Sequence, residues 1–279
     1  MKVLIIFNSF SGNKRKHKKI EYIKNEISKI YDDMDFFSSF EIGSITKKIK
    51  LEGMNYDTII TLGGDGTIHE VINAIMSLDR RPSLAVIPFG TCNDFAKNFT
   101  YNNIDKALDV IKNGKKEDIS LTKINDTYMT YAMAFGSATE ISYNIPSSLK
   151  QSFLGLAYYI YAFKYLFKKL DRPIINNKKC FIGVLTKSNY LAGMRLRNKT
   201  NISSNTFNYK LFNNKLRILG FLRFFSYIAF NIGKKEEKEN LTINFQNDTK
   251  INIDGEYAFT TKELNIEVKR NALSIITKN

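Results

Sequence analysis

The chain has little cysteine: its 279 residues include only Cys92 and Cys180. Two cysteines cannot build the disulfide framework of a small secreted domain or the cysteine-rich ligand set of a structural zinc site. Disulfide-poor chains are typical of reducing compartments. We therefore expect a reduced, cytoplasmic protein.

Long hydrophobic runs are also missing. No uncharged apolar stretch approaches the roughly 20 residues that a membrane-spanning helix needs. At the start of the chain, Lys2 is followed by only five apolar residues before Asn8. This stretch is too short for a signal peptide, and none is expected.

Acidic residues are fewer than basic ones, 27 against 42, which gives a net charge of +15 and a pI near 9.5. Such a surface suits an anionic partner, either a nucleotide, a nucleic acid or an acidic membrane surface. No nucleic-acid-binding motif accompanies the charge, so nucleic acid is not an expected partner. Five of the six residues 14–19 are Lys or Arg. The run indicates either a solvated helical turn or attraction for ATP phosphates or anionic lipid.

One stretch organises the first half of the chain. Thr58 to Leu62 is apolar and rich in β-branched residues, which is typical of a buried strand. The glycine-rich residues 63–67, Gly-Gly-Asp-Gly-Thr, follow, and Ile68 opens an apolar pattern with helical spacing. A glycine turn between a strand and a helix start can hold a phosphate, because the helix offers free N–H groups. The alternative is an ordinary strand-to-helix turn.

A second stretch repeats this pattern. Leu84 to Ile87 is another apolar run, and residues 88–97 follow it with a Gly-Thr turn. Asn93 or Asp94 is placed to cap a helix. Two such loops predict a ligand site at the carboxyl edge of a parallel sheet.

These segments resemble those of a known family. Residues 63–67, 88–96 and 254–256 (Asp-Gly-Glu) resemble the three signature segments of the bacterial diacylglycerol kinase and lipid kinase family, which includes sphingosine and ceramide kinases. Residues 8–12 resemble its N-terminal nucleotide loop, although Ser9 stands where the family usually has proline. NAD kinases and phosphofructokinases carry similar glycine segments, and residues 90–96 are what favours the lipid kinases. The likeness runs from residue 1 to about residue 270.

The predicted fold class is α/β with two domains, similar to NAD kinase and diacylglycerol kinase. Strands and helices alternate through residue 124, which indicates a doubly wound nucleotide-binding domain over residues 1–124. Residues 266–279 are expected to return to it. Residues 125–265 are expected to form a mainly antiparallel β-sandwich that holds the lipid substrate. Within it, residues 241–245 and 251–253 suggest a hairpin around residues 246–250.

The resemblance also implies site residues. Glu256 would be the general base, with Asp254 beside it. Asp65 and Asp94 would hold Mg²⁺ or its waters, although the metal ligands themselves are left unassigned. The residues expected to bind ATP are Asn8, Ser9, Phe10, Ser11, Gly12, Ser39, Gly63, Gly64, Asp65, Gly66, Thr67, Ile68, His69, Thr91 and Asn93. Gram-positive members have a structural magnesium site around an acidic turn. The matching residues 199–207 contain no acid, so that site is not expected.

The leading hypothesis is an ATP-dependent lipid kinase acting on diacylglycerol or a similar lipid alcohol. It would work at an anionic membrane surface, peripherally attached to the inner face. The alternatives are an NAD kinase-like enzyme with a soluble substrate, and a non-catalytic nucleotide- or membrane-binding regulator. The aromatic segments 153–170 and 216–232 are either helices packed on the sheet or a membrane-interfacial surface. Exposed strand edges could pair in a homodimer.

Overall fold

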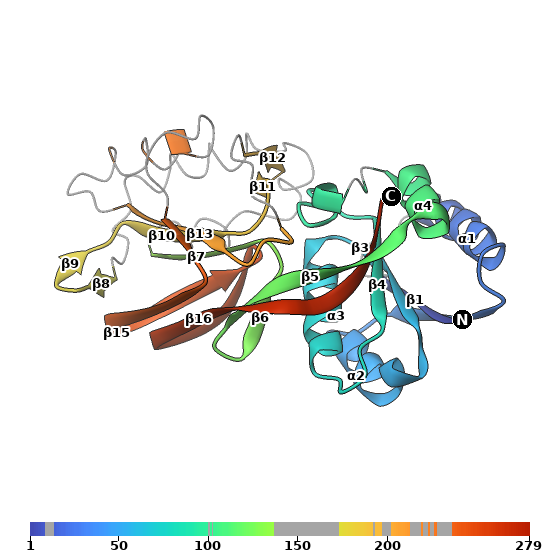
Figure 1. The fold of residues 1–279 in the computed structure, drawn as a ribbon, viewed down its shortest axis with the longest axis horizontal. Coiled ribbons are helices and arrows are strands. Elements are labelled where there is room, and N and C mark those ends of the chain that lie inside the picture. The colour runs from blue at the N-terminus through green and yellow to red at the C-terminus, as the bar shows by residue number, and fades with distance from the viewer. Residues whose placement is uncertain are drawn as a thin grey trace. The chain divides into compact units, whose positions relative to one another are not determined.

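A computed structural model of the chain describes residues 1–8, 14–99, 101, 103–136, 173–191, 193–196, 202–212, 219, 223, 226–227 and 236–279 (Figure 1). It divides into two compact units: Met1–Ile119 with Asn271–Asn279, and Ser120–Arg270. β5 (Lys115–Ile124) and β16 (Glu256–Thr277) each run from one unit into the other. The domain boundaries predicted after residues 124 and 265 therefore stay predictions.

The first unit is built on a parallel sheet with the order β4-β3-β1-β2. Its strands are β1 (Lys2–Asn8), β2 (Asp33–Ser39), β3 (Thr58–Gly63) and β4 (Ser83–Pro88). β16 adds its last residues beside β4, where Ile275 pairs with Leu84. β3 is buried along its whole length, as expected for a β-branched strand covered on both faces.

Helices cover both faces of this sheet (Figure 1). They are α1 (Lys14–Ser28), α2 (Ser44–Glu52), α3 (Asp65–Met76) and α4 (Ile104–Asn113), with short 3₁₀ turns at Gly53–Asn55 and Ala96–Phe99. α1 packs near α4, and α2 packs against α3. Each crossover returns the chain to the start of the next parallel strand, so the carboxyl ends of β1 to β4 share one edge.

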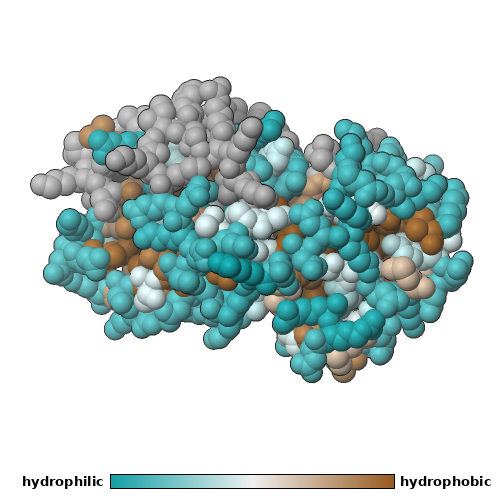
Figure 2. Space-filling model, in the orientation of Figure 1, coloured by the Kyte–Doolittle hydropathy of each residue, from teal (hydrophilic) through white to brown (hydrophobic). Residues whose placement is uncertain are grey.

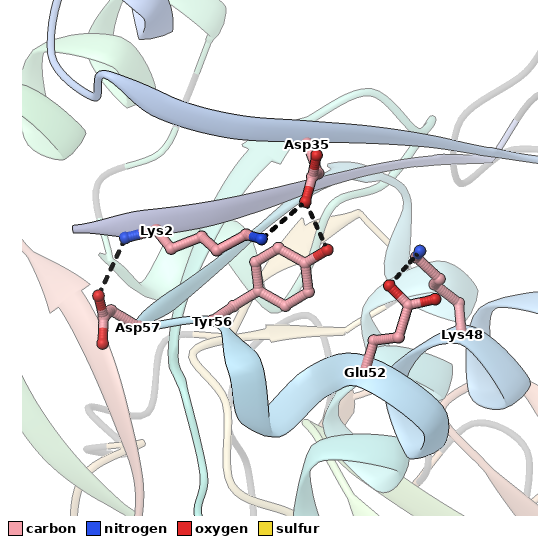
Figure 3. A network of polar contacts seen from close by, with 6 residues as sticks. All are labelled: Lys2, Asp35, Lys48, Glu52, Tyr56 and Asp57. Atoms are coloured by element: carbon pink, nitrogen blue, oxygen red, sulfur yellow. Dashed lines mark hydrogen bonds and ion pairs between the residues drawn. The ribbon is translucent and has the colours of Figure 1, made fainter.

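The opposite, amino-terminal edge is held by a polar network (Figure 3). The Lys2 backbone N–H donates to Asp57, and its ammonium lies 3.4 Å from the Asp35 carboxylate. The Tyr56 hydroxyl donates to the same carboxylate at 2.7 Å. This hydrogen bond is the main reason why the pKa of Asp35 lies below its ordinary value. The network joins the starts of β1, β2 and β3.

The second unit is antiparallel, with the order β14-β13-β10-β7-β15-β16. These strands are β7 (Ala132–Gly136), β10 (Ile182–Thr186), β13 (Phe207–Phe212), β14 (Glu236–Lys238) and β15 (Asn240–Ile253), besides β16. Shorter strands are β6 (Thr127–Met129), β8 (Ile174–Ile175), β9 (Lys178–Lys179), β11 (Tyr190–Leu191) and β12 (Met194–Arg195). A parallel α/β unit followed by antiparallel strands confirms the predicted fold class.

Tyr227 is among the described residues of the second aromatic segment, residues 216–232. It is buried in an apolar cluster with Phe212, edge-on at 5.7 Å between ring centroids. Residues 153–170, and most of residues 216–232, lie outside the described residues. The interfacial role suggested for them stays a prediction.

Two local predictions were wrong. β15 continues through residues 246–250 as one strand with a β-bulge. It forms a hairpin with β16, and its two halves do not pair with each other. The hairpin turn is Asp254-Gly255, where both residues have positive φ, 52° and 89°. After β4, where a helix capped by Asn93 or Asp94 was expected, the loop leads to the short 3₁₀ turn Ala96–Phe99, and Asn93 has a positive φ of 53°. In the described part of the chain no helix has the length and apolarity to cross a membrane.

Candidate active site

A pocket of about 190 Å³ opens at the carboxyl edge of the parallel sheet. It is lined by the ends of β1, β3 and β4 and by the start of α3: Phe7, Asn8, Leu62, Gly63, Gly64, Thr67, Phe89 and Gly90. The rings of Phe7 and Phe89 pack edge-on, with centroids 5.8 Å apart, and both line the pocket. The pocket lies where parallel α/β sheets hold their ligands.

Two glycines set the shape of this pocket. A Cβ added to Gly90 would lie 2.4 Å from the Cα of Gly64, and one added to Gly64 would lie 3.0 Å from the Cα of Gly90. The two loops therefore touch backbone to backbone, which only glycine permits. Phe89 N–H donates to the Gly63 carbonyl at 3.0 Å and continues the pairing of β3 with β4 into the loops.

The helix start offers donors to an anion. Among the residues that the structure describes, no side chain caps the N-terminus of α3, where Gly64 is the N-cap residue in an extended conformation. The Asn8 amide donates to the Thr67 hydroxyl at 3.2 Å and ties the end of β1 to the first turn of α3. Uncapped N–H groups and the positive end of the helix dipole, beside a pocket, form a phosphate-binding arrangement.

The two predicted acids of this unit lie on the two touching loops. Asp65 opens α3, and its carboxylate accepts the Phe95 backbone N–H at 3.0 Å. Asp94 is fully buried next to Phe95 in the chain. Asn93 closes its own loop, since its amide both accepts from Gly90 N–H and donates to Gly90 carbonyl, each at 2.9 Å.

Other predicted ATP-binding residues receive less support. The Ser39 hydroxyl is buried and bonded to the Ser44 hydroxyl and the Glu41 carbonyl. Ile68 is buried, and its N–H donates to the Gly64 carbonyl. His69 lies one turn into α3 beside the Asn73 amide. Thr91 is exposed on the loop, and residues 9–12 lie outside the described part of the chain. A nucleotide contact by each of these residues stays a prediction.

In the second unit, Asp254 is a buried acid with three backbone donors. Its carboxylate accepts the N–H groups of Thr130, Tyr131 and Ala132 at 2.8, 2.9 and 3.1 Å. Its own N–H donates to the Ala132 carbonyl at 2.8 Å. These bonds fasten the β15–β16 turn to the chain entering β7. Both carboxylate oxygens are occupied, which suits a positioning role better than proton transfer.

Glu256, unlike Asp254, is exposed to solvent. It is the first residue of β16 and pairs with Ile253 across the turn. Among the residues that the structure describes, no side chain pairs with its carboxylate. Because Asp254 fastens the turn, the backbone of Glu256 is held in place, and its role as general base stays a prediction.

Sequence reasoning missed Lys187, which follows β10. Its side chain is buried, and its ammonium donates to the Ser120 carbonyl at 2.6 Å. Its backbone N–H donates to the Tyr131 carbonyl, next to the Asp254 contacts. Burial lowers the pKa of Lys187 from 10.5 to about 7. A lone lysine after a strand gives no signal in the sequence that its side chain will be buried.

The sequence also missed Glu70, whose carboxylate accepts both the backbone N–H and the hydroxyl of Thr46, at 3.1 and 3.0 Å. It caps the N-terminus of α2 from the neighbouring helix α3. Gly43, the N-cap residue of α2, has no side chain to do so.

Neither Asp65 nor Asp94 lines the pocket, and magnesium binding by them stays a prediction. Mg²⁺ in nucleotide sites takes one or two carboxylates, phosphate oxygens and several waters. Asp65 and Asp94 supply two carboxylates on adjoining loops. No group of three metal-ligating side chains occurs among the described residues.

Comparisons with known proteins show which family this chain resembles. Residues 2–124 match the diacylglycerol kinase catalytic domain. Residues 2–124 thus form a domain of the diacylglycerol kinase catalytic family. A diacylglycerol kinase of Staphylococcus aureus (strain bovine RF122 / ET3-1) is 35% identical over 183 residues, which are 64% of this chain and 58% of that protein. One from Staphylococcus saprophyticus is 34% identical over 199 residues, 68% of this chain and 65% of that protein.

The matched region thus spans about 58% of the length of the S. aureus diacylglycerol kinase. Solved structures extend the likeness in fold to nearly the whole chain. A diacylglycerol kinase structure from Bacillus anthracis has a TM-score of 0.77 at 23% identity and covers 99% of this chain and 96% of that one. An NAD kinase from Archaeoglobus fulgidus has a TM-score of 0.54 at 13% identity, with coverage of 99% and 94%. This chain and the NAD kinase thus share a fold.

Proposed function

We propose that this protein is an ATP-dependent lipid kinase that transfers the γ-phosphate to the hydroxyl of diacylglycerol or a similar lipid alcohol, which gives phosphatidic acid. The observation that carries the proposal is the pocket that Gly64 and Gly90 help to line, with the uncapped start of α3 beside it. The match of residues 2–124 to the diacylglycerol kinase catalytic domain supports kinase activity, and the identity of the acceptor is what the proposal adds.

Phosphoryl transfer depends mainly on positioning and charge neutralisation. The N–H groups at the start of α3, with Thr67, bind the phosphates. Thr91, on the exposed loop after β4, donates a further hydrogen bond. Asp65 and Asp94 would hold Mg²⁺ or its waters, and the bound ion would neutralise phosphate charge.

Glu256 takes the proton. As the lipid hydroxyl oxygen forms its bond to the γ-phosphorus, the bond from that phosphorus to the bridging oxygen of ADP breaks, and ADP leaves. The hydroxyl proton passes to the Glu256 carboxylate, a general-base step that is typically worth about 10²- to 10⁴-fold in rate. Asp254 does not react; it fixes the turn that carries Glu256.

The experiment offers labelled ATP and magnesium to the full chain with different acceptors. Lipid alcohols are presented in mixed micelles, and NAD is presented in solution. Label in phosphatidic acid supports diacylglycerol as the acceptor, and label in another phospholipid changes only the substrate. Label in NAD would instead favour the soluble-substrate alternative that the NAD kinase fold suggests. ATP binding without any transfer would favour a regulator, although the presence together of Asp65, Asp94 and Glu256 argues against a decayed site.

A further inference from the structure

The turn between β2 and α2 presents two large apolar side chains to solvent. Phe40 is 73% exposed and Ile42 is 95% exposed. The turn itself is held firmly: Ser39 and Ser44 hydroxyls bond to each other at 2.7 Å, and Ser44 also donates to the Glu41 carbonyl at 2.8 Å. Glu70 caps the helix that follows. A turn with this many internal bonds has no need of exposed apolar side chains for its own stability.

The position of this turn is specific. β2 pairs with β1 in parallel register, and Ser39 is opposite Asn8, which lines the phosphate pocket. Phe40 and Ile42 therefore project from the same edge of the sheet that holds the pocket. α1 also begins at this edge, after the end of β1, with Lys14, Arg15, Lys16, Lys18 and Lys19 in its first two turns and no acid in its first turn.

The surface has the chemistry of a membrane contact. The face of the molecule in Figure 2 is mainly hydrophilic, with apolar residues at the surface in separate patches. Apolar side chains that protrude beside basic ones suit the headgroup level of an anionic bilayer. Lys18, Lys19 and Lys47 are exposed around this edge, against one acid in the turn, Glu41.

A nucleobase platform would look different. Ligand sites for small molecules are concave and enclose most of their ligand. Neither Phe40 nor Ile42 lines the pocket at this edge. Side chains exposed to this degree protrude from the surface, and a protruding pair fits the surface of a bilayer better than it fits a small ligand.

We propose that the turn Phe40–Gly43 is a membrane-docking element that inserts Phe40 and Ile42 into an anionic bilayer, with the exposed Lys18, Lys19 and Lys47 on the headgroups. This inference rests on the proposed function for its purpose, because docking at this edge brings the phosphate pocket to the surface where a lipid hydroxyl lies. Its test does not depend on catalysis.

The test is cosedimentation of the full chain with vesicles of phosphatidylglycerol and phosphatidylcholine, without ATP or diacylglycerol. The wild type binds these vesicles, binds pure phosphatidylcholine vesicles more weakly, and is released by salt. The double variant Phe40→Ser/Ile42→Ser loses about tenfold or more in vesicle affinity, because burial of two such side chains is lost. Its thermal stability stays unchanged, since both side chains are exposed in the free protein.

Leu51→Ser is the matched control. Leu51 is 69% exposed but lies in the last turn of α2, which has returned to the opposite edge of the sheet. The Leu51→Ser substitution should leave vesicle binding unchanged. The proposal is overturned if the wild type does not bind anionic vesicles or if the double variant binds like the wild type. It is also overturned if Leu51→Ser weakens binding equally, or if the double variant loses ATP affinity while it keeps vesicle affinity. Vesicle binding without kinase activity would instead refute the proposed function alone.

Discussion

Gly64 and Gly90 lie back to back, so that a Cβ on Gly90 would come within 2.4 Å of the Cα of Gly64. The contact joins the loops after β3 and β4 and leaves no room for a side chain on either. Gly90→Ala should cost about 1–3 kcal/mol in unfolding free energy and abolish ATP binding, since backbone on both sides must move. Thr91→Ala, at the next and exposed position, should keep wild-type stability in the same denaturant titrations. Equal stability and ATP affinity of Gly90→Ala and wild type would contradict the close contact.

Asp254→Ala should destabilise the second unit, because it leaves three N–H groups without their acceptor. Unsatisfied buried donors predict a loss of about 2–5 kcal/mol. Asp254→Asn should lose less, since one oxygen remains and asparagine accepts the positive φ of the turn. Denaturant unfolding of the two variants measures the difference. A fully stable Asp254→Ala would remove the positioning role.

Glu256→Gln should leave stability unchanged and lower turnover by about 10²- to 10⁴-fold, because the side chain is exposed and its proposed work is to accept a proton. The matched control is Glu263→Gln, an exposed acid on the same strand whose carboxylate accepts from Asn265. It should retain activity. Wild-type turnover by Glu256→Gln would exclude Glu256 as the base.

Lys187 should make stability depend on pH. Because burial lowers its pKa to about 7, the unfolded chain binds one more proton than the folded chain between pH 7 and the ordinary value of 10.5. Stability therefore rises with pH in this window, by at most about 1.4 kcal/mol per unit, and falls as pH drops towards 7. Unfolding between pH 7.5 and 9.5 should show a smaller slope for Lys187→Met. The slope of Lys250→Met, which removes an exposed lysine, should match the wild type.

Much of the fold follows from local pattern. The buried runs of β1, β3 and β4, and the helical spacing after Gly66, are strong signals because both faces of the strands and one face of the helix are covered. The β15–β16 hairpin was mispredicted for a physical reason. A bulge lets polar residues 246–250 continue a strand, while Asp254-Gly255 supplies the two positive φ values that a tight turn requires.

The site was predictable in its loops and less so in its side-chain roles. Glycines and acids after two strands predict a phosphate site, and a pocket lies at that edge, but phosphate binding there stays a prediction. The burial of Asp254 depends on N–H groups more than 120 residues earlier in the chain. The burial of Lys187 depends on the Ser120 carbonyl, 67 residues away. Neither partner is visible in the local sequence.

The measurement that tests the account most directly is the time course of label transfer from γ-labelled ATP to diacylglycerol in mixed micelles, with magnesium and the full chain. The account predicts labelled phosphatidic acid that accumulates in proportion to wild-type enzyme and is nearly absent with Glu256→Gln. An active preparation that binds ATP but labels no lipid under these conditions would contradict the assignment as a lipid kinase.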